Sequence, residues 1–354
     1  MNPRDDGADD ADGGRDPQAA LACAARHGTS TPRGQQVLPA TRGGRFGRMF
    51  PFLPARDPGP AAIDDLVDGM LALAGTSGQN RAISAGYTYL GQFVDHDITF
   101  DPTSSFQRDN DPNALVNFRT PRFDLDSVYG SGPADQPYLY DWKTPHCPGV
   151  KLLVETQPSG GASADLPRNA QGRALIGDAR NDENLIVSQL HLMFLTFHNK
   201  VVDELYGPPR RLRSRTLFDE AQRLVRWHYQ WLIMDDFLPT IVGEEMARAV
   251  RPRLSTQPGV TTPISQLRLY RWDDAPAIPV EFSGAAFRFA HSMVRKDYKL
   301  NDLPVVPILE NPSKPHEDHL GGFTWLQKRF EIQWDRFFFT TDDANGKNLS
   351  LIHI

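Results

Sequence analysis

Cysteine is scarce in this sequence, since Cys23 and Cys147 are its only two cysteines among 354 residues. They exclude a disulfide framework and form no Cys-x-x-Cys pair for a metal or for redox chemistry. A run of roughly 18 apolar residues, the length that a membrane-spanning helix needs, is missing as well. The acidic first residues, MNPRDDGADDADGG, have no apolar core of the kind found in signal peptides. We therefore expect a cytoplasmic protein without a membrane span, and export by another route stays open.

The sequence also has no excess of positive charge, since 44 acidic residues outnumber 38 basic ones and give a net charge of −6. This balance gives no reason to expect nucleic acid as a partner. Residues 1–40 are rich in Asp, Gly, Arg, Ala and Pro and hold few large apolar side chains. We expect this segment to be disordered, because it cannot bury enough surface to offset the entropy cost of ordering.

Alternating strand patterns are rare too, and most apolar residues recur at helical spacing. The aromatic-rich segment 45–54 predicts an extended arm laid on a core, and the polar segments 101–118 and 130–182 predict long loops. Loops of this length usually carry sites or are disordered. The expected fold class is mainly α, with long functional loops. The expected helices span residues 62–75, 85–96, 183–206, 216–240 and 281–294.

The motif GQFVDHDIT (91–99) places Asp95, His96 and Asp97 in a row within an otherwise apolar helix. Neighbouring side chains on a helix point about 100° apart, so the three can serve three different places. Gln92 lies four residues before His96 and shares its face. A solvated surface cluster is the alternative, but the flanking Phe and Ile residues argue against it.

A second motif, TPRFDLDSVYG (120–130), carries Asp124 and Asp126 at alternating positions, with Thr120 just upstream. On an extended segment both carboxylates project to one side. Two carboxylates, a hydroxyl and backbone carbonyls suit a hard cation such as calcium. Taken alone, this motif is better interpreted as a solvated turn.

Two further motifs carry ionisable residues at helical spacing. In GDARNDEN (177–184), Arg180 and Glu183 are three residues apart and so fall on one helical face. A helix N-terminus explains the acidic residues of this motif but not Arg180. In EFSGAAFRFAHSMVR (281–295), His291 follows two phenylalanines on an apolar helix, where a core histidine is the alternative to a ligand.

Together these motifs, in this order, resemble the animal-type haem peroxidases of the peroxidase–cyclooxygenase superfamily, from about residue 45 to about residue 339. The resemblance implies a helical domain that binds haem b, reduces hydrogen peroxide and oxidises small organic or halide donors. It implies that His96 is the distal histidine that moves the peroxide proton, and that Arg180 is the distal arginine. It further implies that His291 is the proximal iron ligand and that Gln92 lines the distal cavity.

The same resemblance implies two further groups of residues. Asp95 and Glu183 match the two carboxylates that form ester bonds to haem methyl groups. Where the most oxidising family members have a methionine after that glutamate, this chain has Asn184, so no sulfonium link is expected. The implied calcium ligands are Asp97, Thr120, Asp124, Asp126 and the backbone carbonyl of Arg122.

A fatty-acid dioxygenase of the same superfamily is the first alternative function. In those enzymes a radical-bearing tyrosine lies three residues before the proximal histidine. Here that position is Arg288, which is the peroxidase pattern and an expected haem contact. The second alternative is a non-catalytic module that keeps the fold and the calcium site.

The sequence departs from the family after His291, because no asparagine there opens the Asn-x-x-Arg-x-Arg pattern that supplies the proximal partner. The last six residues, LSLIHI (349–354), match a translated sequencing adapter, although native sequence is the alternative. We therefore expect residues 41–348 to be a partial peroxidase domain. Weak or heterogeneous haem binding follows from that expectation.

Overall fold

The computed structural model describes residues 46–54, 58–74, 83–101, 117–156, 162–208, 210, 212–250, 277–315 and 317–338. Within these ranges the chain is mainly helical, and the predicted fold class is confirmed. One two-stranded sheet pairs β1 (Asp297–Tyr298) antiparallel with β2 (Val306–Pro307). No helix of the described part is long and apolar enough to cross a membrane. The predicted disordered segment 1–40, residues 349–354 and most of the loop 101–118 lie outside the described residues.

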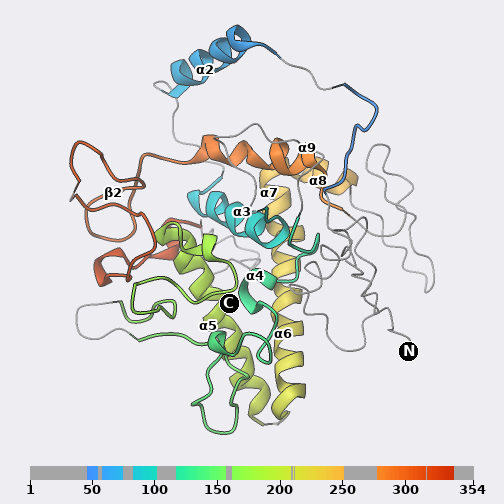
Figure 1. The fold of residues 1–354 in the computed structure, drawn as a ribbon, viewed down its shortest axis with the longest axis vertical. Helices are drawn as coiled ribbons and strands as arrows, with labels where there is room; N and C mark the ends of the chain where they lie inside the picture. Colours follow the sequence, from blue (N-terminus) through green and yellow to red (C-terminus); the bar gives the residue numbers. More distant parts are fainter. Residues whose placement is uncertain are drawn as a thin grey trace, which may run out of the picture.

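The helical elements follow one another along the chain, coloured from blue to red in Figure 1. They are α2 (Pro60–Ala74), α3 (Ala85–Ile98), α4 (Asp126–Tyr129), η2 (Pro137–Leu139), η3 (Ala179–Asp182), α5 (Leu185–Tyr206), α6 (Ser214–Trp231), η4 (Leu232–Phe237), α7 (Leu238–Val242), α8 (Glu244–Val250), α9 (Val280–Gly284), η6 (Ala286–Met293), η7 (Lys328–Phe330) and η8 (Trp334–Arg336).

Helices α5 and α6 lie side by side, and α3 packs against α5 above them (Figure 1). Helix α5 has no Gly or Pro over 22 residues, and the Asn184 side chain caps it by accepting from the backbone N–H groups of Ile186 and Val187. Its apolar stripe joins that of α3, where Phe93 stacks on Phe194 with ring centroids 4.8 Å apart. The core of the molecule is therefore built where α3, α5 and α6 meet.

The helices predicted over 62–75, 85–96 and 183–206 are confirmed by α2, α3 and α5. The one predicted over 216–240 appears as α6, a π-helical turn at η4 and the short α7. The continuous helix predicted over 281–294 is wrong. Helix α9 ends at Gly284, Ala285 leaves helical geometry, and the chain continues as the 3₁₀-helix η6. Glycine is a poor helix former and a common place for such a break.

The predicted extended arm is present over residues 46–54. Gly47 donates to the carbonyl of Ile278 and accepts from the N–H of Val280 just before α9. The backbone N–H groups of Met49 and Phe50 donate to the carboxylate of Glu281. The arm is therefore held by its backbone, while Phe52 remains 95% exposed.

The long segment 130–182 is largely irregular, as predicted, and buried polar side chains hold it in place. Asn199 of α5 accepts from the N–H of Leu152 and donates to its carbonyl. Arg168 is fully buried and pairs with Asp182 and Asp165 at 2.8 and 3.1 Å. These bonds fix the loop against α5 and lead the chain into η3, which positions the next motif.

Candidate active site

A cavity of about 330 Å³ lies between α3 and η6 and brings together motifs from distant parts of the sequence. His96 lines it from α3 and His291 lines it from η6. The other ionisable residues of its wall are Tyr87, Tyr89, Asp95, Glu183 and Arg288. Its apolar lining includes Phe237, Ile241, Phe287, Met293 and Ile308.

His96 is buried, and its two ring nitrogens face different surroundings. Nδ1 lies 2.8 Å from Oδ1 of Asn181. Nε2 lies 3.9 Å from a carboxylate oxygen of Glu183, on the side of the cavity. Burial, followed by the positive charge of Arg180, lowers the pKa of His96 to about 4. The imidazole is therefore neutral at neutral pH and available as a base.

Gln92 lies on the same cavity wall, one turn before His96, as its spacing predicts. Its amide donates to the carboxylate of Glu183 and accepts from Nδ2 of Asn184 at 3.2 Å. Partial desolvation at the cavity wall raises the pKa of Glu183, although its side chain is 41% exposed and the positive charge of Arg180 opposes the shift. These contacts hold the Glu183 side chain at the edge of the cavity.

Asp95 joins the two walls of the cavity. Its carboxylate accepts from Nη1 of Arg288 at 2.8 Å and from Oγ1 of Thr99 at 3.0 Å. Burial raises the pKa of Asp95, although the charge of Arg288 opposes this effect. Arg288 also donates to the carbonyl of Ser283 in α9. The ion pair therefore ties α3 to α9 and η6.

Arg180 is not among the described residues that line the cavity. Its guanidinium donates to the carbonyls of His96 and Thr99 at 3.1 and 2.6 Å and pairs with Asp178 at 2.8 Å. Arg180 and Glu183 have different surroundings, since Arg180 contacts backbone carbonyls at the end of α3 whereas Glu183 lines the cavity. The guanidinium therefore supplies hydrogen-bond donors to carbonyls at the C-terminal end of α3, including that of His96.

His291 is exposed on η6 rather than buried in an apolar helix. Its Nδ1 lies 2.9 Å from the carbonyl oxygen of Arg288. This contact gives Nδ1 an acceptor from the backbone and leaves Nε2 as the nitrogen that could bind iron.

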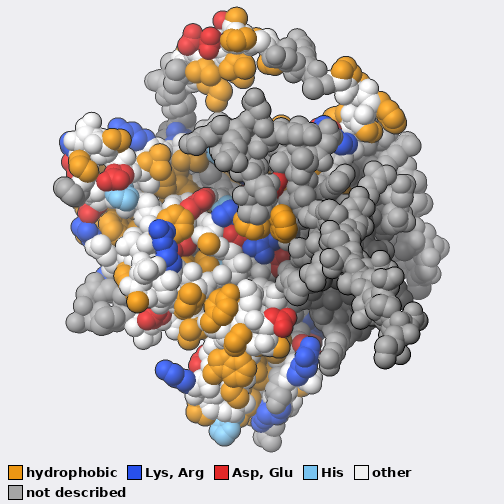
Figure 2. All heavy atoms as spheres, viewed as in Figure 1, with side chains coloured by type: hydrophobic (Ala, Val, Ile, Leu, Met, Phe, Trp, Pro, Cys, Tyr) orange, Lys and Arg blue, Asp and Glu red, His pale blue; other side chains and the backbone are white. Residues whose placement is uncertain are grey.

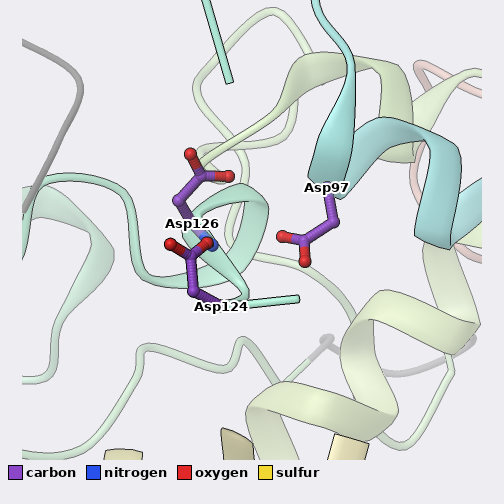
Figure 3. A group of neighbouring side chains, drawn as sticks. All are labelled: Asp97, Asp124 and Asp126. Carbon is purple, nitrogen blue, oxygen red and sulfur yellow. The ribbon is translucent and has the colours of Figure 1, made fainter. Parts of the chain in front are cut away.

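Three carboxylates meet on the other side of α3. Ligand atoms of Asp97, Asp124 and Asp126 lie within 4.8 Å of one another. Asp97 extends from α3 toward the other two (Figure 3). Burial raises the pKa of Asp97 and Asp126, and the negative charge of Asp124 adds to both shifts.

The motif predicted an extended chain around these carboxylates, and this prediction is wrong. Leu125 has left-handed backbone angles and Asp126 begins α4, so a turn brings the two carboxylates together. Thr120 donates to Asp124 at 2.7 Å. Among the described residues neither carboxylate oxygen of Asp126 has a hydrogen bond, although Nη1 of Arg119 lies 3.3 Å away. Such a set of oxygens suits a hard cation, and the role of the Arg122 carbonyl stays a prediction.

Several buried residues of the site were not predicted from the sequence. Asn181 lies between two histidines, since its Nδ2 is 3.0 Å from Nδ1 of His191 on α5. Asp178 lies between Arg180 and Arg119. Asp178 and Asn181 belong to the motif 177–184, whose polar residues were the only available indication.

Comparison with known proteins identifies the family. Residues 101–339 match the model of the animal haem peroxidases, and the chain belongs to this family. It is 25% identical to pig (Sus scrofa) thyroid peroxidase over 63% of its length and 27% identical to Drosophila melanogaster chorion peroxidase over 50%. The chain spans 23% of the length of each relative. Peroxidase A of Dictyostelium discoideum matches at 16% identity with a TM-score of 0.47, over 65% of this chain and 52% of that one. Haem is the cofactor that this family implies.

Proposed function

We propose that this chain is the haem-binding part of a peroxidase that reduces hydrogen peroxide and oxidises a small organic or halide donor. The observation that carries the proposal is one cavity lined by His96 and His291, which are 195 residues apart in the sequence and lie on opposed elements. When bound, haem supplies the iron and the redox chemistry. Nε2 of His291 is the proposed ligand to that iron.

His96 is the proposed acid–base residue. Its neutral Nε2 takes a proton from one peroxide oxygen and returns it to the oxygen that leaves as water. The low pKa of His96 supports this role, because the ring is not protonated before peroxide arrives. Arg180, which contacts the carbonyls of His96 and Thr99, supports the same role of His96, since its positive charge opposes protonation of the ring.

Asp95 and Glu183 are the proposed points of covalent attachment to haem. Both carboxylates line the cavity: Asp95 is buried, whereas the Glu183 side chain is 41% exposed. Asp97, Thr120, the Arg122 carbonyl, Asp124 and Asp126 form the proposed calcium site. The proposal is supported by the carboxylate oxygens of Asp126, which accept no hydrogen bond from any described residue.

The alternative functions have less support. Dioxygenase chemistry needs a tyrosine three residues before His291, and Arg288 holds that position in an ion pair with Asp95. A non-catalytic module would not need His96, Arg180 and His291 together. No observation on the described residues favours either alternative.

The test is a titration of the purified chain with hemin, followed by its Soret absorption. We expect the wild-type chain to bind hemin weakly, as predicted from the sequence, and His291→Ala to bind at least about tenfold more weakly still, with a shifted band. His228→Ala is the matched control, because His228 is an exposed helical histidine whose Nδ1 also contacts a backbone carbonyl, 2.7 Å away. Equal loss in both variants would contradict the assignment of His291.

A second measurement addresses the chemistry of the hemin-loaded chain. His96→Ala should lower peroxide-dependent oxidation of a phenol by about 100-fold or more, the usual contribution of a general acid–base residue. Hemin affinity should change little, since His96 lies on the opposite wall from the iron ligand. Unchanged turnover in His96→Ala would overturn the proposed base.

A further inference from the structure

A buried chain of three polar side chains runs from the cavity into the core. His96 on α3 contacts Asn181 on η3 at 2.8 Å, and Asn181 contacts His191 on α5 at 3.0 Å. Asn181 and His191 have no exposed surface, and His96 is 5% exposed. Nε2 of His191 has no hydrogen-bond partner among the described residues, so the Asn181 amide is its one hydrogen bond there.

An amide in this place fixes the protons of both rings. Its Oδ1 can only accept and its Nδ2 can only donate. With Oδ1 toward His96, that ring carries its proton on Nδ1 and keeps Nε2 bare. With Nδ2 toward His191, that ring keeps Nδ1 bare and carries its proton on Nε2. The opposite amide orientation would reverse both rings and place a proton on the cavity nitrogen of His96.

Both rings are neutral, which a choice between tautomers requires. Burial lowers the pKa of His191 to about 3, and His96 is 5% exposed beside the Arg180 guanidinium, which donates to its backbone carbonyl. Bare Nε2 faces the cavity, where it lies 3.9 Å from Glu183. A base must present an unprotonated nitrogen to its substrate, so the orientation of one buried amide decides whether His96 can act.

We propose that Asn181 and His191 are positioning residues that hold His96 in the tautomer with Nε2 unprotonated toward the cavity. The catalytic importance of this tautomer rests on the proposed peroxidase function. The tautomer itself is inferred from the hydrogen bonds alone. Asn181 accepts the Nδ1 proton of His96. His191 fixes the orientation of the amide, because its bare Nδ1 is the acceptor that Nδ2 needs in this buried place.

The experiment labels histidine nitrogens with ¹⁵N in the full chain without haem and reads each ring by long-range ¹H–¹⁵N correlation at about pH 8, where free histidine is neutral. In the wild-type chain we expect the proton of His96 on Nδ1 and that of His191 on Nε2. Asn181→Asp should keep His96 unchanged and move the His191 proton to Nδ1, because a carboxylate accepts from both rings. Asn181→Leu should release His96 toward a mixture of tautomers.

His198→Phe is the matched control. His198 is a second fully buried histidine on α5, but its partners are the Tyr129 hydroxyl at 3.1 Å and the Val150 carbonyl at 2.9 Å, not the cavity residues. We expect its substitution to leave both tautomers unchanged. In hemin-loaded protein, Asn181→Leu should slow the reaction with peroxide by roughly 10- to 100-fold, and Asn181→Asp should recover most of it.

The outcomes separate this inference from the proposed function. A wild-type His96 with its proton on Nε2, or an unchanged His96 in folded Asn181→Leu, overturns the inference whatever the enzyme does. If Asn181→Leu does not fold, the reversal of His191 in Asn181→Asp decides, and its absence overturns the inference. The expected tautomers in a chain that binds hemin but turns over no peroxide would support the positioning and contradict the proposed function.

Discussion

At the scale of single residues, Asp178 organises the charges behind the cavity. It is buried, pairs with Arg180 at 2.8 Å and with Arg119 at 2.5 Å, and accepts from the backbone N–H of Arg180. Burial raises the pKa of Asp178, but the hydrogen bonds and charge of Arg180, followed by the charge of Arg119, outweigh it and hold that pKa well below its usual range. The Asp178 carboxylate therefore holds two arginines that contact different sites. Arg180 contacts α3 beside the cavity, and Arg119 lies beside Asp126 in the carboxylate cluster.

This low pKa predicts a pH dependence of stability. Because the pKa of Asp178 is lower in the folded chain than in the unfolded chain, its contribution is complete above about pH 4 and is lost as the pH falls toward the folded pKa. We expect Asp178→Asn to lower the free energy of unfolding by about 3 kcal/mol at neutral pH and to flatten its decline below about pH 4. Urea unfolding at several pH values measures both effects.

Asp318→Asn is the control for this prediction, since Asp318 pairs with Arg329 at 2.5 Å on the surface. An exposed ion pair should contribute less than about 1 kcal/mol. If the free energies of unfolding of Asp178→Asn and the wild-type chain declined equally with falling pH, a low pKa of Asp178 would not contribute to the acid sensitivity of the fold.

The sequence predicted the residues that line the cavity better than the residues that support them. Gln92, Asp95 and His96 line the cavity because α3 follows the predicted helix geometry, whereas Glu183 lines it from the end of η3 and His291 from η6, which are 3₁₀ segments. The support of His96 by Asn181 could not be predicted, because it depends on how η3 enters α5. Likewise, the acceptor for His291 is a local backbone carbonyl, which no sequence pattern marks.

At the scale of elements, the end of α3 separates two sites. Asp95 contacts Arg288, His96 faces the cavity and Asn181, and Asp97 points toward α4, so three successive residues diverge as helix geometry requires. Asp97 accepts from the N–H groups of Leu125 and Ser127 at 3.2 and 3.4 Å. A cation among the carboxylates would therefore brace the same helix that carries His96.

Calcium should accordingly raise the thermal stability of the chain, and EDTA should reverse the effect. Saturating calcium at about 100 times its dissociation constant would add about 2.7 kcal/mol to the free energy of unfolding. Asp126→Asn should lose most of this increase, because it removes a carboxylate whose oxygens have no hydrogen bond. Differential scanning calorimetry with and without calcium measures the shift.

Two controls accompany the calcium measurement. Asp302→Asn changes an 82% exposed carboxylate paired with Arg336 and should keep the full calcium effect. Magnesium should stabilise less, because it keeps its water shell more tightly. An equal calcium shift in wild-type and Asp126→Asn chains would place the cation elsewhere.

Elements were predictable where periodicity was long and uninterrupted. The 22 residues of α5 and the 14 of α3 follow one apolar stripe each, so tertiary packing and local preference agree. The prediction over 281–294 was wrong because Gly284 and Ala285 break the helix, although the apolar pattern continues into η6. The extended form predicted around Asp124 was wrong because Leu125 adopts left-handed angles, which residue type alone rarely indicates.

At the scale of the whole molecule, burial is concentrated in the body formed by α3, α5 and α6 and does not include α2. The side chains described along α2 are exposed, among them Ile63, Leu66, Val67 and Met70. In both views α2 stands apart at the top (Figures 1 and 2), and Figure 2 shows hydrophobic side chains on it in orange. An amphipathic pattern thus predicted the helix correctly but not its burial.

Substitutions in these two regions should therefore differ strongly in cost. Leu190 on α5 is fully buried, and Leu190→Ala should lower the free energy of unfolding by about 2–5 kcal/mol through lost contacts and a new cavity. Leu66 is 63% exposed, so Leu66→Ala should change stability by less than about 0.5 kcal/mol. The two changes delete the same atoms and differ only in surroundings, which makes each the control for the other. Urea unfolding measures both, and a loss above about 2 kcal/mol for Leu66→Ala would mean that α2 packs against the body in solution.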